Sequence, residues 1–302
     1  HLGFVKQNFY QIFNLKFSTF MGYANAITYG SPSNQDGTPY TVSLEIKDGT
    51  DPTGNTWVHR CNGGWMKFDL TTAIDSTTHN GLWVVTAARC FDVYQQPSDW
   101  RAKIGARSNG DTTGVSTESI RYILRHPTSD IALVKLSRRP SELSPNRFML
   151  NFPQSANHAA TNRSCVLSGW GITDSLLTDN YENLPQEQYQ GTVTGITRSW
   201  CRSQYYPSID DATFPSDVIC TTAQYGCNNC ADTGPFPSPC KSYDYGTPLA
   251  CIYGNEAIIL GVGTAQDDSQ SCGDAFAGQS IPPIWVSIST YWTWIRNTVN
   301  IN

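Results

Sequence analysis

The sequence predicts an all-β protein made of two small β-barrels and a C-terminal α-helix. Three observations lead to this fold class: short apolar or alternating runs between turn-forming residues, one helical pattern at the end of the chain, and a polar segment near its middle. The chain has 302 residues, of which 39% are hydrophobic and 15% charged. That composition is typical of a folded protein and excludes a mainly disordered one.

The first half of the chain begins with an extension and continues with strands. Residues 1–26 form the predicted N-terminal extension, in which apolar side chains recur every three to four residues from Phe9 to Phe20, as in a short amphipathic helix. The first barrel is predicted over residues 27–150. Its clearest strand candidates are residues 40–46, 82–86 and 130–136.

The second half repeats this pattern after a linker. Residues 151–164 are rich in Asn, Ala, Ser and Thr and are the predicted inter-barrel linker. The second barrel and the helix occupy residues 165–302, with strand candidates at 164–171, 258–262 and 284–288. Ser289 is the expected N-cap of the terminal helix, and its apolar face is Tyr291, Trp294, Ile295 and Thr298.

Charge and hydropathy exclude two classes of partner. The net charge is −5, so no global basic surface favours nucleic acid. The chain has no apolar run of about 18 residues or more, so we expect no membrane span. The first residue is His1 rather than Met, which is compatible with a signal peptide already removed.

The ten cysteines indicate an oxidising compartment. A zinc site built on Cys227 and Cys230 needs a second pair, for which Cys220 and Cys240 are the candidates. Disulfides account for the even count more simply, and they predict a secreted protein. The sequon Asn162-Arg163-Ser164 agrees with secretion and makes Asn162 a predicted glycosylation site.

Five blocks, in the right order from Ile27 to the end of the chain, resemble the trypsin/chymotrypsin-like serine proteases. Ala87-Ala88-Arg89-Cys90 resembles the family's Ala-Ala-His-Cys segment, and Asp130-Ile131-Ala132-Leu133 resembles its aspartate segment. Asp244-Tyr245-Gly246-Thr247-Pro248-Leu249 resembles the nucleophile loop. The other two blocks are the start at Ile27 and the run from Cys165 to Gly171. The resemblance implies two six-stranded antiparallel barrels.

The same alignment implies a degenerate catalytic triad. The family needs a hydroxyl nucleophile, an imidazole base and a carboxylate that orients it. Here Arg89 stands at the imidazole position and Tyr245 at the nucleophile position, and only Asp130 matches. A guanidinium does not accept a proton at working pH, and a phenol is bulky and weakly acidic. We therefore expect no catalytic residue, no cofactor and no metal.

Neighbouring positions depart from the family pattern too. Tyr243 replaces a glycine whose backbone approaches the substrate oxyanion, in a loop one residue longer than the family pattern. Thr264 begins the segment that normally reads Ser-Trp-Gly, and Pro283 stands where a glycine keeps the specificity pocket open. A rescued activity would need His79 or His126 as a base and Ser242 as a displaced nucleophile.

The resemblance also implies how the cysteines pair. Four bridges follow the family pattern, and the remaining two cysteines form a Cys-x-x-Cys pair whose redox-active form is a less favoured alternative. The predicted disulfides are Cys61–Cys90, Cys165–Cys251, Cys201–Cys220, Cys240–Cys272 and Cys227–Cys230.

These observations predict a secreted, non-catalytic serine protease homologue with a binding or regulatory role, as decoy, adaptor or cofactor, towards a protein partner. Two alternatives remain open: a structural or matrix component on the same scaffold, and an enzyme with residual or novel activity. For the triad position we expect Arg89 to form an ion pair with a buried Asp130, its fork donating two hydrogen bonds, with Tyr245 over the guanidinium. The alternative is that Arg89 extends into solvent and leaves Asp130 to backbone amides or water.

Overall fold

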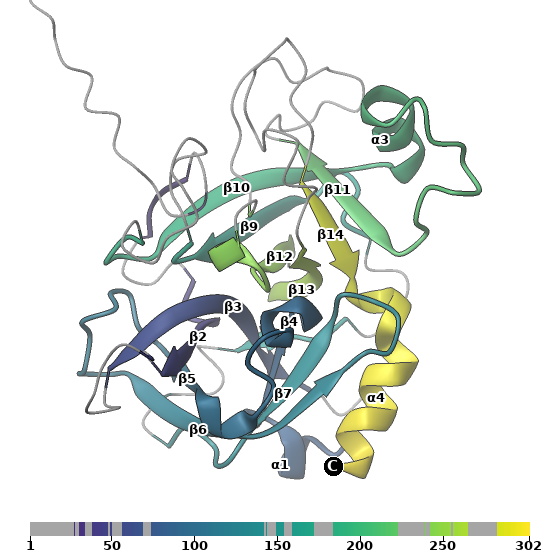
Figure 1. Cartoon of the computed structure of the whole chain (residues 1–302). Helices are drawn as coiled ribbons and strands as arrows, with labels where there is room; N and C mark the ends of the chain where they lie inside the picture. Colours follow the sequence, from purple (N-terminus) through teal and green to yellow (C-terminus); the bar gives the residue numbers. More distant parts are fainter. Residues whose placement is uncertain are drawn as a thin grey trace, which may run out of the picture.

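The computed structural model describes residues 27, 30–33, 38–47, 49, 56–68, 74–141, 143, 149–153, 159–171, 184–222, 239, 242–254, 256–264 and 283–302. Strands dominate these residues, which confirms the predicted mostly β fold. Figure 1 shows the strands in two groups, one above the other, with the yellow C-terminal helix α4 (Trp292–Ile301) running along the side of the lower group.

Six strands of the first half close into an antiparallel barrel. They pair in the order β3–β2–β5–β6–β7–β4, and β4 pairs again with β3. Apolar residues of β2 such as Val42 and Leu44 face the barrel core, while Ser43 and Glu45 face the other side, as strand alternation requires. The strands are β2 (Thr41–Lys47), β3 (Trp57–Lys67), β4 (Trp83–Thr86), β5 (Trp100–Ile104), β6 (Ser116–Arg125) and β7 (Ala132–Leu136).

The strands of the second half also pair in antiparallel fashion, in the order β12–β9–β10–β11–β14–β13. The two-residue strand β1 (Ser31–Pro32) pairs with β10, and β8 (Leu150–Asn151) pairs in parallel with both β3 and β13. β8 therefore connects the two groups. The others are β9 (Ser164–Gly169), β10 (Tyr189–Ile196), β11 (Val218–Thr222), β12 (Pro248–Tyr253), β13 (Glu256–Gly263) and β14 (Ile284–Ser287).

The largest core cluster extends across the junction of the two groups. It contains the fully buried Trp65 and Trp83 of the first barrel together with Ile259 and Val262 of β13. Ile295 of α4 is buried in the same cluster. The two strand groups therefore share one apolar core.

The short helices bring one correction. α4 begins at Trp292, and its N-cap Tyr291 makes no side-chain cap hydrogen bond. The prediction that Ser289 caps this helix is wrong, because Ser289 lies inside the 3₁₀ turn η6 (Ile288–Tyr291) that precedes it. The other helical segments are α1 (Ser76–His79), η1 (Ala88–Phe91), η2 (Pro97–Asp99), α3 (Arg198–Tyr205) and η4 (Ser242–Asp244).

Two predictions about organisation stay open. The proposed extension, residues 1–26, with its helical pattern from Phe9 to Phe20, lies outside the described residues. The division of the chain at residues 151–164 stays a prediction. Among the described helices, none is long and apolar enough to cross a membrane.

Candidate functional site

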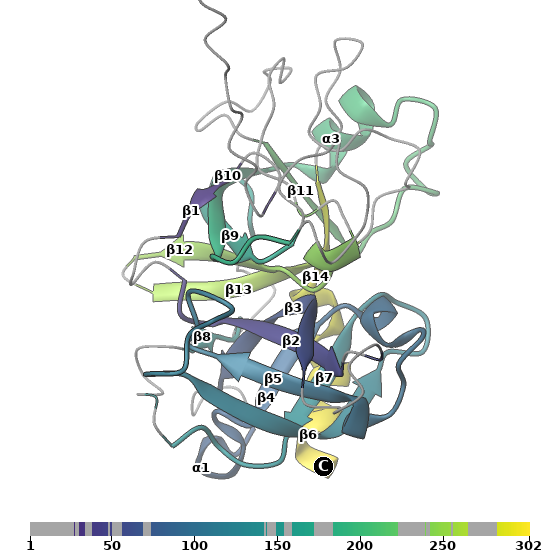
Figure 2. The same cartoon turned by 60° about the vertical axis from the view of Figure 1, so that its left-hand side comes forward.

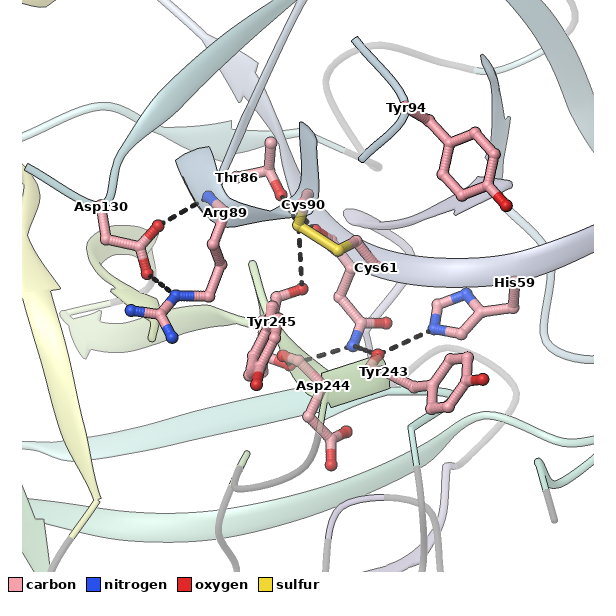
Figure 3. Close-up of a disulfide and its surroundings, with 12 residues drawn as sticks. His59, Cys61, Thr86, Arg89, Cys90, Tyr94, Asp130, Tyr243, Asp244 and Tyr245 are labelled. Atoms are coloured by element: carbon pink, nitrogen blue, oxygen red, sulfur yellow. Dashed lines mark hydrogen bonds and ion pairs between the residues drawn. A yellow bond between two sulfur atoms is a disulfide. The ribbon is translucent and has the colours of Figure 1, made fainter. Parts of the chain in front are cut away.

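Arg89 and Asp130 meet at the junction of the two strand groups. The chain leaves β4 and turns at once into η1, whose N-cap Ala87 offers no side-chain acceptor. Asp130 supplies one instead: its Oδ1 accepts from the Arg89 backbone N–H at 2.8 Å. Its Oδ2 lies 2.5 Å from the Arg89 Nε (Figure 3). The predicted ion pair is therefore present.

The geometry of this pair differs from the expectation in two respects. The guanidinium contributes one donor, Nε, and the second hydrogen bond comes from the Arg89 backbone, so the expected two-pronged fork is wrong. The side chains are 36% exposed for Arg89 and 16% for Asp130, so the carboxylate is half-buried rather than buried. Burial opposes the charge on Arg89, yet the adjacent Asp130 carboxylate raises the pKa of this guanidinium above its usual value.

Thr264 adds a third donor to Asp130. Its hydroxyl donates to Asp130 Oδ2 from the end of β13. Residues 265 and 266 of the same predicted segment lie outside the described residues. The carboxylate thus links the first barrel to a strand of the second half.

Tyr245 lies over the Arg89 guanidinium, as predicted. The Arg89 Cζ is 5.3 Å from the centre of the tyrosine ring, and the phenol also interacts with the guanidinium through a hydrogen bond. The backbone of Tyr245 is fixed to β3, because its carbonyl accepts from the Asn62 N–H at 2.8 Å. The backbone carbonyl and the side chain of Tyr245 are therefore both fixed by contacts.

A buried histidine that the sequence analysis missed holds the loop before Tyr245. His59 Nδ1 lies 2.7 Å from the Ser43 hydroxyl, and His59 Nε2 lies 3.0 Å from the Tyr243 carbonyl oxygen (Figure 3). Burial lowers the pKa of His59 to about 4, although the hydrogen bond to Tyr243 opposes this shift. The imidazole is neutral near pH 7 and donates one N–H to that carbonyl. In the sequence, the sign that His59 lies near this site was its position two residues before Cys61.

Asn62 completes the link between β3 and this loop. Its amide Nδ2 donates to the Tyr243 carbonyl at 3.2 Å and to the Thr247 hydroxyl at 3.1 Å. Its Oδ1 accepts from the Trp170 backbone N–H at 3.2 Å. One fully buried side chain therefore joins the first barrel, the end of β9 and the 243–247 turn.

The hydroxyl–imidazole pair of Ser43 and His59 is enclosed. Ser43 is 0% exposed and His59 is 3% exposed. The ring of Trp170 packs against the imidazole, with centroids 5.9 Å apart. The Ser43 hydroxyl is therefore not accessible to a substrate from solvent.

The histidines considered for a rescued activity have other contacts. His79 Nδ1 accepts from the Trp83 indole N–H at 3.4 Å. His126 packs edge-on against Tyr291 and Trp294, next to the C-terminal helix, and its Nδ1 accepts two backbone N–H groups. Burial lowers the pKa of both. Ser242 begins η4, and its side chain is not described.

Three of the predicted disulfides are present: Cys61–Cys90, Cys165–Cys251 and Cys201–Cys220. The last of these excludes Cys220 as the zinc ligand that the alternative interpretation required. Within the described ranges, no three His, Cys, Asp or Glu side chains come together as metal ligands would. The predicted pairs Cys240–Cys272 and Cys227–Cys230 lie outside the described residues.

Asn162 sits in an exposed turn before β9. Its φ is +60°, a left-handed conformation that asparagine tolerates better than most residues. The exposed side chain suits the predicted glycosylation, which stays a prediction.

Comparisons with known proteins agree with this architecture. A family model described as Trypsin matches residues 27–295. The chain is 24% identical to chymotrypsin-like elastase family member 1 from Bos taurus, over 90% of this chain and 89% of the relative. The proteins of the same name from Felis catus and Homo sapiens are also 24% identical, over 90% of this chain and 89% and 92% of those relatives.

Proposed function

The chain belongs to the trypsin family, and we propose that it is a secreted, non-catalytic member that acts by binding another protein. The observation that carries this proposal is the ion pair between Arg89 and Asp130. In the family, the equivalent carboxylate orients an imidazole base. Here it holds a guanidinium, which keeps its proton at every working pH.

The position of Tyr245 supports the same conclusion. Its phenol lies against the Arg89 guanidinium, which has no lone pair to take a proton from the phenol. His59, the imidazole fixed to this loop, is buried and donates to a backbone carbonyl. Its Nδ1 faces the enclosed Ser43 hydroxyl, so this imidazole does not serve as a base for a nucleophile that a substrate can reach.

The scaffold suits a binding role. We infer that the C-terminal strands make a second six-stranded barrel, since their pairings return from β13 through β12 to β9. Rigid barrels with long loops present binding surfaces, and disulfide-linked, elastase-like chains are consistent with secretion. The loops proposed for the partner, residues 47–57, 69–81, 172–189 and 221–239, lie partly outside the described residues.

A labelling experiment tests the non-catalytic part. We expect a fluorophosphonate probe to leave the full chain unlabelled under conditions that label bovine elastase family member 1 stoichiometrically. Stoichiometric labelling at any single residue would overturn the proposal and favour the alternative of an enzyme with novel activity.

A capture experiment tests the binding part. The chain is immobilised on a support and exposed to fluid from its native source. The protein that it captures is then purified and titrated against the free chain. Saturable 1:1 binding of one protein supports the proposal. Absence of any saturable partner favours the alternative of a structural or matrix component.

A further inference from the structure

A second polar pocket lies on the outer face of the first barrel. It has a volume of about 290 Å³ and shares no lining residue with the Arg89–Asp130 site. One wall is formed by Arg101 and Lys103 of β5. The opposite wall is formed by Asn109 and Thr112 of the loop that joins β5 to β6, and by Thr117 of β6. Figure 2 shows β5 and β6 side by side on this face.

The loop over the pocket is fixed by its own hydrogen bonds. Asp111 Oδ2 accepts from the backbone N–H groups of Arg107 and Ser108 at 2.8 and 2.7 Å. The Asn109 N–H donates to the carbonyl of Gln186 at 2.8 Å, which ties the loop to the segment before β10. The pocket is therefore preformed, and a ligand need not order it.

The β5 wall carries positive charge with unused donors. Lys103 is 6% exposed, and its ammonium donates to the Asn109 carbonyl. An ammonium has three N–H groups, and among the described residues the other two meet no acceptor. Arg101 binds Glu45 through Nε at 2.6 Å, and its terminal amino groups have no hydrogen-bond acceptor in the described part of the chain. Both cations stand beside carboxylates, since Glu45 pairs with Arg101 and Asp111 lines the same pocket. The N–H groups that the two cations leave free are suited to the carboxylate of a ligand.

The loop wall carries acceptors and hydroxyls. Asn109 Nδ2 donates to the Pro185 carbonyl at 3.2 Å, whereas its buried Oδ1 has no hydrogen-bond partner. The hydroxyls of Thr112 and Thr117 form no hydrogen bond with another described residue. A hydroxyl of a ligand fits this wall, because it exchanges hydrogen bonds with the exposed hydroxyls of Thr112 and Thr117.

We propose that this pocket binds a small hydroxylated carboxylate of the size of one uronic-acid ring. The carboxylate lies on Lys103 and Arg101, and the hydroxyls face Thr112 and Thr117. The volume is just below the range that holds drug-sized ligands, which suits a single ring. This site is independent of the catalytic status of the chain.

Isothermal titration of the full chain with sodium glucuronate tests the proposal. We expect saturable 1:1 binding. At matched ionic strength, acetate lacks the hydroxyls and glucose lacks the carboxylate, and each should bind at least about 10-fold more weakly, since each loses one wall. No saturable heat with glucuronate, or equal affinity for glucuronate and either fragment, would overturn the proposal.

Two threonine variants make the test specific to the pocket. Thr117→Val on β6 should weaken glucuronate binding by about 5-fold through loss of one hydrogen bond. Thr192→Val, the same change at an exposed position of β10, should leave binding unchanged. Both positions are exposed on strands, where valine is well tolerated, so both variants should fold. Equal binding by the two variants would place glucuronate elsewhere and refute the proposed site.

Discussion

Three donors surround the Asp130 carboxylate: the backbone N–H of Arg89, its guanidinium Nε, and the hydroxyl of Thr264. Two of these donors belong to Arg89. The carboxylate therefore caps the turn η1 through the Arg89 backbone N–H and also pairs with the charge of the Arg89 side chain. The Tyr245 ring also lies against the guanidinium, with its centre 5.3 Å from the Arg89 Cζ. At this scale the site is a structural cluster that joins four separate parts of the chain.

The first prediction concerns the coupling of this pair. Arg89→Ala should destabilise the protein by about 1–2 kcal/mol, because it leaves a half-buried carboxylate without its cation, with solvent screening reducing the cost. The double variant Arg89→Ala/Asp130→Asn should be more stable than Arg89→Ala alone, since no charge is then left unpaired. Urea denaturation measures both.

The control for this cycle is a more exposed pair. Arg125 and Asp92 are 40% and 58% exposed, and Arg125→Ala should cost no more than about 0.5 kcal/mol. If Arg89→Ala cost as little, or if the double variant were the least stable, the pair would have no structural role.

The second prediction concerns pH and His59. The folded-state pKa is about 4 and the ordinary value is 6.5, so only the unfolded chain takes up this proton between those pH values. Stability is therefore fully present above about pH 6.5 and is lost as the pH falls towards 4. One pKa unit corresponds to about 1.4 kcal/mol, so His59 alone should cost about 3 kcal/mol over this window.

A variant separates His59 from the other titrating groups. The free energy of unfolding is measured by urea denaturation at pH 7 and pH 4.5 in the wild type and in His59→Gln. The variant should show a clearly smaller loss on acidification, since His79, His126 and the carboxylates are common to both proteins. Parallel pH profiles would contradict the buried, neutral His59.

At the scale of elements, β3 organises the site. Through His59 and Asn62 it holds the carbonyl of Tyr243, and through the Asn62 backbone it holds Tyr245. Cys61 lies between His59 and Asn62 in the sequence and links the strand to η1 by its disulfide with Cys90. One strand therefore positions both the Arg89 turn and the loop that carries Tyr245.

The third prediction tests how the C-terminal helix is anchored. Ile295 is 0% exposed in the main core cluster, whereas Ile301 of the same helix is 82% exposed. Ile295→Ala should destabilise the protein by about 2–4 kcal/mol through lost burial and a cavity. Ile301→Ala, the matched control, should change stability by less than about 0.5 kcal/mol. Equal effects on the thermal midpoint would show that α4 does not pack as described.

Prediction from sequence succeeded where a pattern is local and strong. The buried runs at β4 and β7 were predicted because continuous apolar segments are visible in the chain. The helical spacing gave only part of the buried face of α4, since Ile295 was predicted whereas the fully buried Val299 was missed. Ser289 was misassigned because a 3₁₀ turn leads into the helix, and its propensity signal resembles that of a cap.

The site was predictable only in part. Arg89, Asp130 and Tyr245 were found because they stand in blocks that resemble a family. His59, Asn62 and the role of Thr264 were missed, because their partners lie far away in sequence and depend on how the two strand groups pack. The single-donor geometry of Arg89 likewise depends on the η1 backbone, which no side-chain pattern encodes.

For the whole molecule, the trypsin-family chain combines three disulfides, a core shared by its two strand groups, and an Arg89–Asp130 ion pair with Tyr245 over the guanidinium. None of these interactions requires a catalytic residue. This agrees with the proposed binding role, in which the rigid framework serves to present loops.

Hydrolysis of a peptide library by the purified chain tests the non-catalytic proposal most directly. Cleavage is followed by mass spectrometry beside bovine elastase family member 1, and the Asp130→Asn variant is prepared in parallel to identify contaminating protease. The account predicts no cleavage by the wild type above that of the variant. Sequence-specific cleavage that Asp130→Asn abolishes would contradict it.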